Sequence, residues 1–220
     1  MMLVLTATLA GCGPAGEVAE VSDELSSGSA VCGARVGAAY EGVYAQSNST
    51  CVWPNACSCK CATGNCDTGY GVGYQCVELA MRFWAQKYAT FWRDNAWGLF
   101  DDAIGRCDTW ASPNGAKASA DWRPPTPGDM VVWGRRNDGW GHVAVITAVG
   151  ARTIDIMEQN VAAAAYTPTN GVGHLAWDPN RGLISGTSWA SSPSPAGWLH
   201  AYHNVEHPWP AGYRWNGCHP

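Results

Sequence analysis

Three residues whose types could together do chemistry follow one another in this 220-residue chain: Cys76, His142 and Glu158. Cys76 opens the stretch CVELAMRFW, whose apolar residues recur at the spacing of a helix. A thiol at a helix start faces unpaired backbone N–H groups and the positive end of the helix dipole, and both lower its pKa. The position therefore favours a nucleophilic thiolate at Cys76, with a buried structural thiol as the alternative.

His142 begins one predicted strand, and Glu158 lies near the end of the next one. If a three-residue turn joins these strands, Ala148 pairs with Arg152 and His142 lies directly opposite Glu158. Opposed residues have Cβ atoms about 4.5–5.5 Å apart, so the hairpin would hold an imidazole beside a carboxylate. A thiolate nucleophile needs such a base and a group that orients the base. Asn160 would share the strand face of Glu158 as a further polar group.

The surrounding pattern predicts the elements that position these residues. One helix is expected over residues 75–89, with an apolar face made of Val77, Ala80, Met81, Trp84 and Tyr88. A second helical stretch is expected over residues 92–104. Short β-branched stretches predict strands over residues 129–133, 142–149, 153–159 and 197–203. Three segments are predicted to be mostly loop: 31–66, where Gly, Ser, Asn and Cys dominate, the turn-rich 108–128, and 160–195, which is rich in Ala, Gly, Pro and Ser. Helices followed by an antiparallel sheet indicate the α+β class.

Composition limits the function classes. Apolar residues make up 46% of the chain and charged residues 14%, so a packed core is expected and disorder is not. The net charge is −5 and the sequence has no cluster of Lys and Arg, which argues against nucleic acid or an anionic membrane surface as a partner. The 13 Trp residues are expected mainly in the core and loops, with a groove that stacks on sugars as the alternative.

The N-terminal stretch MMLVLTATLAGC is apolar but too short to span a bilayer as a mature helix. Its LAGC ending resembles a bacterial lipobox. That resemblance implies cleavage before Cys12, lipidation of Cys12 and a flexible tether over residues 13–30. We therefore expect an exported lipoprotein of the cell envelope that contacts the membrane by its lipid alone; secretion with cleavage elsewhere is the alternative.

Export changes how the other cysteines are interpreted, because disulfides persist outside the cytosol. Without Cys12 and Cys76 an even number remains, compatible with four bridges of unknown connectivity. The cluster CVWPNACSCKCATGNC lacks the paired C-x-x-C spacing of zinc sites and has no histidine nearby, so we expect no metal. The disulfide candidates are Cys32, Cys51, Cys57, Cys59, Cys61, Cys66, Cys107 and Cys218.

The motifs YQCVELAMRFW, PGDMVVW, GHVAVI and MEQN, in this order, closely resemble the CHAP family of cysteine, histidine-dependent amidohydrolases and peptidases. The YQCVE and EQN details are most similar to its glutathionylspermidine-amidase branch. The resemblance implies a papain-like fold, with the helix that carries the cysteine packed on an antiparallel sheet, and cleavage of amide bonds without a cofactor. By position it implies Cys76 as nucleophile, His142 as base and then acid, Glu158 as the group orienting His142, and Asn160 as an auxiliary group. Gln75 and the Cys76 N–H are the expected oxyanion donors.

These observations predict a signal segment over residues 1–12, a tether over 13–30, a cysteine-rich extension over 31–66, a CHAP catalytic domain over 67–205 and a tail over 206–220. The activity that the CHAP resemblance implies is hydrolysis of amide bonds in the stem peptide or cross-bridge of peptidoglycan, and we expect a monomer. Two alternatives stay open. One is an amidase acting on a small conjugate such as glutathionylspermidine, and the other is a catalytically silent, disulfide-rich binding module.

Overall fold

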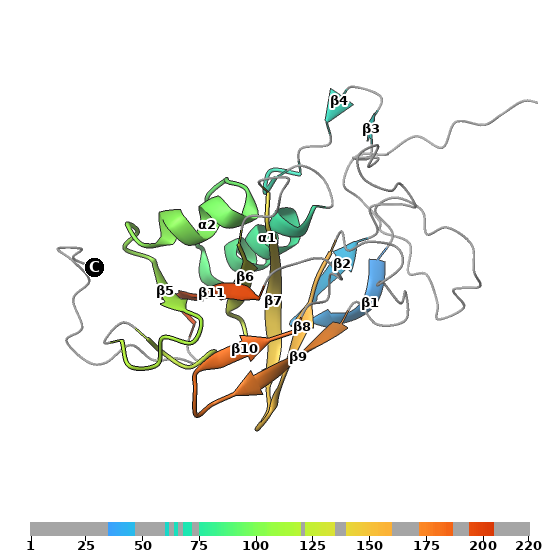
Figure 1. Ribbon diagram of the computed structural model, residues 1–220. Coiled ribbons are helices and arrows are strands. Elements are labelled where there is room, and N and C mark those ends of the chain that lie inside the picture. The colour runs from blue at the N-terminus through green and yellow to red at the C-terminus, as the bar shows by residue number, and fades with distance from the viewer. Residues whose placement is uncertain are drawn as a thin grey trace, which may run out of the picture.

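A curled antiparallel sheet with two helices on one face forms the body of the protein (Figure 1). The computed structural model describes residues 35–46, 60–61, 64–65, 68–71, 75–119, 122–134, 140–159, 172–186 and 194–204. The helices are α1 (Cys76–Tyr88) and α2 (Ala96–Ala103). The strands of the sheet are β5 (Thr109–Pro113), β6 (Met130–Trp133), β7 (His142–Val149), β8 (Thr153–Met157), β9 (Val172–Asp178), β10 (Leu183–Ser185) and β11 (Pro195–Ala201). Their order across the sheet is β10-β9-β8-β7-β6-β11-β5, which confirms the α+β class.

The curl of the sheet brings its two edge strands together. Asn114, directly after β5, donates from Nδ2 to the Ile184 carbonyl of β10 at 2.9 Å, and its Oδ1 accepts from the Ile184 N–H at 2.7 Å. Nδ2 also donates to the Pro195 carbonyl at 2.9 Å. Inside the curl, the rings of Trp177 and Trp198 meet edge to face with centroids 5.9 Å apart. One amide side chain thus satisfies backbone groups that an edge strand would otherwise leave unpaired.

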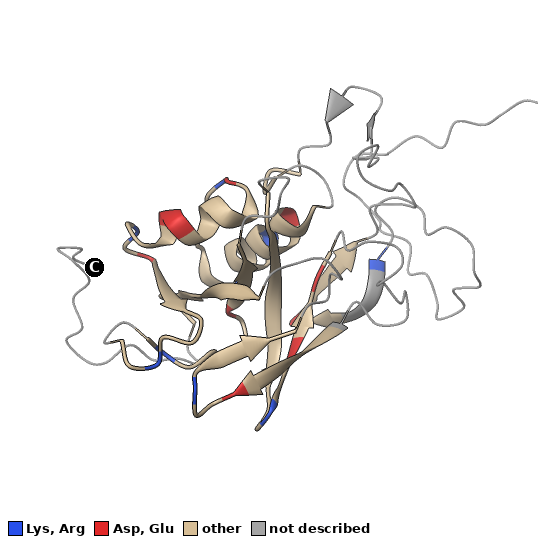
Figure 2. Ribbon diagram, viewed as in Figure 1, with Lys and Arg blue, Asp and Glu red and all other residues tan. Residues whose placement is uncertain are grey.

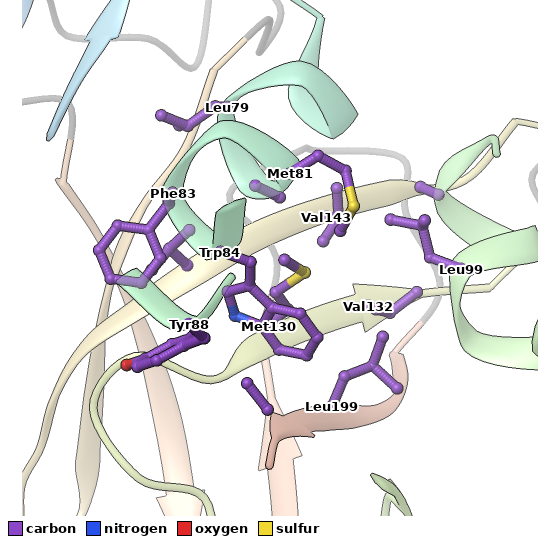
Figure 3. Close-up of a cluster of buried hydrophobic side chains, with 14 of the residues drawn as sticks. Leu79, Met81, Phe83, Trp84, Tyr88, Leu99, Met130, Val132, Val143 and Leu199 are labelled. Atoms are coloured by element: carbon purple, nitrogen blue, oxygen red, sulfur yellow. The ribbon is translucent and has the colours of Figure 1, made fainter. Parts of the chain in front are cut away.

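Helix α1 buries the face of the sheet that lies toward the helices. Met81 and Trp84 of α1 pack with Val132 of β6, Val143 of β7 and Leu199 of β11 in one apolar cluster (Figure 3). The helix begins and ends within one residue of the predicted bounds, because its apolar periodicity is strong. The packing holds the first residue of α1 beside the start of β7, where two of the candidate site residues lie.

Residues in the segment predicted to be loop-like form a β-hairpin that packs against α1. Its strands are β1 (Arg35–Tyr40) and β2 (Val43–Gln46), and a second short pair consists of β3 (Lys60–Cys61) and β4 (Gly64–Asn65). The Tyr40 ring stacks on Phe83 with centroids 5.4 Å apart. The predicted apolar stripe of the helix omitted Phe83 because it assumed one covered face, whereas the hairpin covers a second one. Four alternating residues in β2 were too short a signal to predict the strand.

Other differences from the predicted elements have local causes. Helix α2 begins at Ala96, four residues later than predicted, because the Asn95 side chain caps it by accepting from the Gly98 N–H at 2.9 Å. The segments predicted to be mostly loop contain β5, β9 and β10. These strands carry Gly, Pro or Ser and show little alternation, so pairing with neighbouring strands, more than local propensity, accounts for them.

The charged residues of the described chain are spread over separate elements. Figure 2 shows Lys and Arg scattered over strand ends, connections and helix α1, without a basic stripe along the described helices or strands. Among the described residues, no helix is both long and apolar enough to cross a membrane.

Trp84 provides a test of the core beneath α1. Its side chain is fully buried and its Nε1 donates to the Gly128 carbonyl at 2.9 Å. We expect Trp84→Ala to lower the free energy of unfolding by about 3–5 kcal/mol, because a large cavity and an unpaired carbonyl would remain. Urea unfolding measures this change. Ile104→Ala, at an exposed position directly after α2, is the control and should cost under about 0.5 kcal/mol. Equal losses for the two variants would contradict this packing.

Candidate active site

Cys76 is the first residue of α1 and is a free, partly exposed cysteine. Burial by itself would raise the pKa of its thiol, and this is the largest single influence. The charge of His142 and a hydrogen bond from its ring outweigh that influence, together with hydrogen bonds to the backbone of Val143 and Val77. The pKa of Cys76 is therefore lowered, mainly by His142, and the helix start contributes through the backbone of Val77.

His142, the first residue of β7, is almost completely buried between Cys76 and Glu158. Its Nε2 lies 3.1 Å from Oε2 of Glu158. Since Glu158 occupies Nε2, Nδ1 is the ring nitrogen that remains for the hydrogen bond with the thiol. Burial would lower the pKa of His142, but the charges and hydrogen bonds of Cys76 and Glu158 raise it to about 10. The arrangement favours a thiolate–imidazolium pair held by a carboxylate.

The pairing of β7 with β8 differs from the predicted register. Ala148 pairs with Asp155 and not with Arg152, and Val145 pairs with Met157, with a bulge between Ile146 and Ala148. Continued by one residue, this register sets Glu158 beside Ala144, so direct opposition to His142 was wrong. His142 and Glu158 are instead diagonal neighbours on one face, within reach for a long side chain. The predicted contact forms although the turn length assumed for it was wrong.

Two glycines make room for this pair. Gly141 has φ +71°, and a Cβ there would lie 2.7 Å from the Trp133 carbonyl, so a bare backbone is required directly before His142. The Trp133 ring packs beside the His142 ring, with centroids 5.4 Å apart. A Cβ at Gly173 in β9 would lie 2.9 Å from Oε1 of Glu158. Both glycines therefore shape the site, and neither was predicted to do so.

The remaining candidate residues have different outcomes. Gln75 is the N-cap residue of α1, in an extended conformation and without a side-chain capping bond. Asn160 and Cys12 lie outside the described residues, so their roles stay predictions. Cys107 is disulfide-bonded. Of Cys61 only the backbone is described, in β3, and the other disulfide candidates (Cys32, Cys51, Cys57, Cys59, Cys66 and Cys218) lie outside the described residues. The described part of the chain holds no group of three or more His, Cys, Asp or Glu that could bind a metal ion.

A buried polar network beside the helix start was not predicted from the sequence. Gln159 is 1% exposed, and its side chain contacts the Gln46 N–H, the Gln75 carbonyl and the Glu78 carboxylate. Glu78 is fully buried and pairs with Arg82, at 2.8 Å from Oε1 to Nε. A glutamate in the first turn of a helix and a glutamine after a strand are ordinary on surfaces, so neither residue signalled its burial.

A second buried histidine lies apart from this site. Nδ1 of His200 is 2.8 Å from Oδ2 of Asp129, and its Nε2 is 3.1 Å from Oγ of Ser112. All three side chains are at most 1% exposed, so a substrate could not reach Ser112. Asp129 also accepts from the N–H and the hydroxyl of Thr126. This group links β5, β11 and the turn before β6 and serves the fold.

Taken together, Cys76, His142 and Glu158 can carry out nucleophilic chemistry. A partly exposed thiolate can attack an electrophilic carbon, and an imidazolium at hydrogen-bond distance can protonate a leaving group. The carboxylate holds the ring in place and stabilises its charge. The sequence predicted all three residues, and the structure brings them together.

Comparison with known proteins finds relatives of part of this chain. A segment of the bifunctional glutathionylspermidine synthetase/amidase of Escherichia coli (strain K12) is 32% identical over 106 residues, which are 43% of this chain and 16% of that protein. The glutathionylspermidine synthase of Crithidia fasciculata is 34% identical over 103 residues, which are 41% of this chain and 14% of that protein. The match thus spans about a sixth of the length of these relatives.

Among solved structures, the crystal structure of Ly7917 matches with a TM-score of 0.36 and 14% identity, over 58% of this chain and 53% of that chain. The family model for the CHAP domain matches residues 65–160, a segment that contains Cys76, His142 and Glu158. Over this segment, which is less than half of the chain, the sequence is similar to the CHAP domain family.

Proposed function

We propose that this protein is an exported cysteine amidohydrolase that cleaves amide bonds in the peptide part of peptidoglycan. The observation that supports it most is the continuous chain of contacts from a free, partly exposed Cys76 through His142 to Glu158. The opposite shifts of the two pKa values favour the charged pair, which is the reactive form. The CHAP match over the same residues supports hydrolysis of an amide.

The reaction follows from the positions of these groups. The Cys76 thiolate attacks the carbon of the amide, and negative charge moves to the carbonyl oxygen. The His142 imidazolium gives its proton to the leaving amine as the C–N bond breaks, which leaves a thioester on Cys76. His142, now neutral, takes a proton from water as the water attacks the thioester. The acid is released, and the thiolate–imidazolium pair forms again.

Developing charge on the carbonyl oxygen needs donors close to Cys76. The Cys76 N–H lies at the N-terminus of α1, where backbone donors and the helix dipole favour an anion. The Gln75 side chain is not used as a cap of α1 and is the second proposed donor. Such donors are typically worth a factor of about 10²–10³ in rate.

The choice of peptidoglycan rests on the likeness of the motifs to the CHAP family and on the lipobox-like LAGC sequence before the domain. An exported, lipid-anchored enzyme would meet stem peptides and cross-bridges at the cell envelope. The extracellular side also allows disulfides, and Cys107 is disulfide-bonded.

A small amide conjugate is the second candidate substrate. The matched relatives are named glutathionylspermidine synthetase/amidase and glutathionylspermidine synthase, and their likeness to this chain favours a conjugate of that kind. Export argues against it, because it would separate the enzyme from a conjugate made in the cytosol. A silent binding module is less favoured, since Cys76 is a free cysteine beside His142.

Digestion of purified peptidoglycan by the chain from Gly13 onward, with mass spectrometry of the released fragments, tests the proposal. Fragments that appear with the native protein and not with Cys76→Ala would support it, and their new termini would identify the bond. Glutathionylspermidine is assayed in parallel with both proteins. Turnover of the conjugate without peptidoglycan fragments would replace the proposed substrate. Turnover of neither substrate, with Cys76 still alkylated by iodoacetamide, would contradict the proposed hydrolase.

A further inference from the structure

The side-chain amide of Gln159 joins three parts of the protein directly beside the candidate site. It follows Glu158 in the chain and is 1% exposed. Its Oε1 accepts from the Gln46 N–H of β2 at 2.6 Å. Its Nε2 donates to the Gln75 carbonyl at 3.0 Å and to Oε2 of Glu78 at 2.9 Å. Because a backbone N–H can only donate, these partners fix which end of the amide faces the helix.

The Gln75 carbonyl belongs to the same peptide unit as the Cys76 N–H. A trans peptide is planar, and its C=O and N–H point in opposite directions. A side chain that holds the carbonyl oxygen therefore also sets the direction of the N–H. The Leu79 N–H reaches the same carbonyl at 3.4 Å, which is longer than the 3.0 Å from Gln159. Gln159 thus makes the shorter of these two contacts to this peptide unit.

Gln159 is itself held by a charged pair whose carboxylate is fully buried. Oε1 of Glu78, a fully buried residue, lies 2.8 Å from Nε of Arg82 and 3.2 Å from Oγ1 of Thr68. Nη2 of Arg82 donates to the Tyr44 carbonyl of β2 at 3.0 Å. The amide therefore lies between the hairpin and the first turn of α1, with both ends anchored. Polar groups this deeply buried are stabilising only when their partners are all in place.

We propose that Gln159 is a positioning residue that aligns the Cys76 N–H as the backbone donor to the oxyanion. The hydrogen bond that it gives to the Gln75 carbonyl orients this peptide unit and strengthens the N–H as a donor. The inference rests on the acyl-transfer chemistry proposed for Cys76 and does not depend on the natural substrate. None of the contacts of Gln159 involves the reacting thiol, so its effect passes through the peptide unit.

Two reagents that modify Cys76 separate this role from simple support of the fold. With p-nitrophenyl acetate, the thiolate attacks the ester carbon, charge develops on the carbonyl oxygen, p-nitrophenolate leaves and acetyl-Cys76 forms. With iodoacetamide, the thiolate displaces iodide from a saturated carbon and no oxyanion forms. Release of p-nitrophenolate and mass spectrometry of Cys76 give the two rates on the same protein.

Gln159→Met keeps the approximate size of the side chain and removes the hydrogen-bond donor. It should lower the acetylation rate by about tenfold, which is less than the loss of rate when an oxyanion donor is removed completely. The alkylation rate should stay within about twofold, because the thiolate–imidazolium pair is unchanged. Asn204→Leu is the matched control. Asn204 is also a buried amide, 2% exposed, and it bonds Asp129 and the Pro127 carbonyl, away from Cys76. Loss of the Asn204 amide should leave the ratio of the acetylation rate to the alkylation rate as it is in the native protein.

An equal fall of both rates in Gln159→Met would overturn the inference, since it would indicate a general loosening of the helix start. No change in either rate would overturn it too. If Gln159→Met does not fold, Gln159→Asn decides in the same way, because its amide is withdrawn from Gln75 by one methylene. Native protein that is alkylated but never acetylated would instead contradict the proposed hydrolase and, with it, this role.

Discussion

Replacing His142 by alanine should lower the alkylation rate of Cys76 at pH 7 by at least about tenfold, because a thiol with an ordinary pKa is only a few per cent thiolate there. Burial remains in the variant and raises the pKa of Cys76, whereas the His142 charge and hydrogen bond that lower it are gone. Hydrolysis of an amide should fall further, by roughly 10²–10⁴-fold, since the proton donor for the leaving amine is lost as well.

The direction in which alkylation of Cys76 depends on pH follows from the lowered pKa of Cys76 and the raised pKa of His142. In the native protein the thiolate persists as the pH falls below the ordinary pKa of a thiol, because the pKa of Cys76 is lowered. The imidazolium is lost only as the pH rises through about 10. The reactive pair therefore exists between these limits. In His142→Ala, alkylation should instead rise steadily toward alkaline pH, with no plateau near neutrality.

Iodoacetamide alkylation from pH 5 to pH 10, followed by mass spectrometry, measures this profile. His174→Ala is the control, because the exposed His174 pairs with Asp155 at 2.7 Å on the neighbouring strands without contact to Cys76. Its profile should match that of the native protein. An unchanged profile for His142→Ala would show that the helix start alone activates the thiol.

Glu158→Gln should lower the rate of amide hydrolysis by roughly 10²–10⁴-fold while leaving the fold intact, because the shape of the side chain is kept and the charge that stabilises the imidazolium is removed. Glu158 is one of the groups that raise the pKa of His142. Without that charge the pKa of His142 falls below about 10, so the alkaline limb of the pH–rate profile should move to lower pH.

Hydrolysis of the amide substrate, followed from pH 6 to pH 11, measures the position of this limb, because cleavage of an amide needs the proton of His142. Asp155→Asn, on β8 (the strand that Glu158 directly follows) and beside the exposed His174, is the matched carboxylate-to-amide control and should leave the limb in place. A slower Glu158→Gln enzyme with an unmoved alkaline limb would mean that Glu158 orients the ring and contributes little to its charge.

The residues that carry the chemistry could be predicted because each is marked by its own element. Cys76 begins a strongly periodic helix, and His142 begins an eight-residue strand that has exactly the predicted bounds. Glu158 was predicted as their partner, but the register was not, since the bulge at residue 147 leaves no signal in a run of alternating apolar residues. The diagonal contact survives because a glutamate side chain is long enough to reach it.

The supporting network could not be predicted in the same way. The burial of Glu78 and Gln159 depends on the hairpin from Arg35 to Gln46, whose strands are too short and weakly patterned to be recognised. Distant parts of the chain meet there, with Gln46 and Gln159 separated by 113 positions. Sequence periodicity reports which face of one element is apolar. It does not report which other element covers that face.

The hairpin and β11 also determine how far the chain can be truncated. The CHAP match covers residues 65–160, but β11 (Pro195–Ala201) inserts between β6 and β5, and Val43 of β2 belongs to the core under α1. A shortened protein with only the matched segment would lose a central strand and the backbone partner of Gln159. A unit that keeps both the hairpin and β11 when it is moved into a fusion protein must therefore extend at least from Arg35 to Ala201.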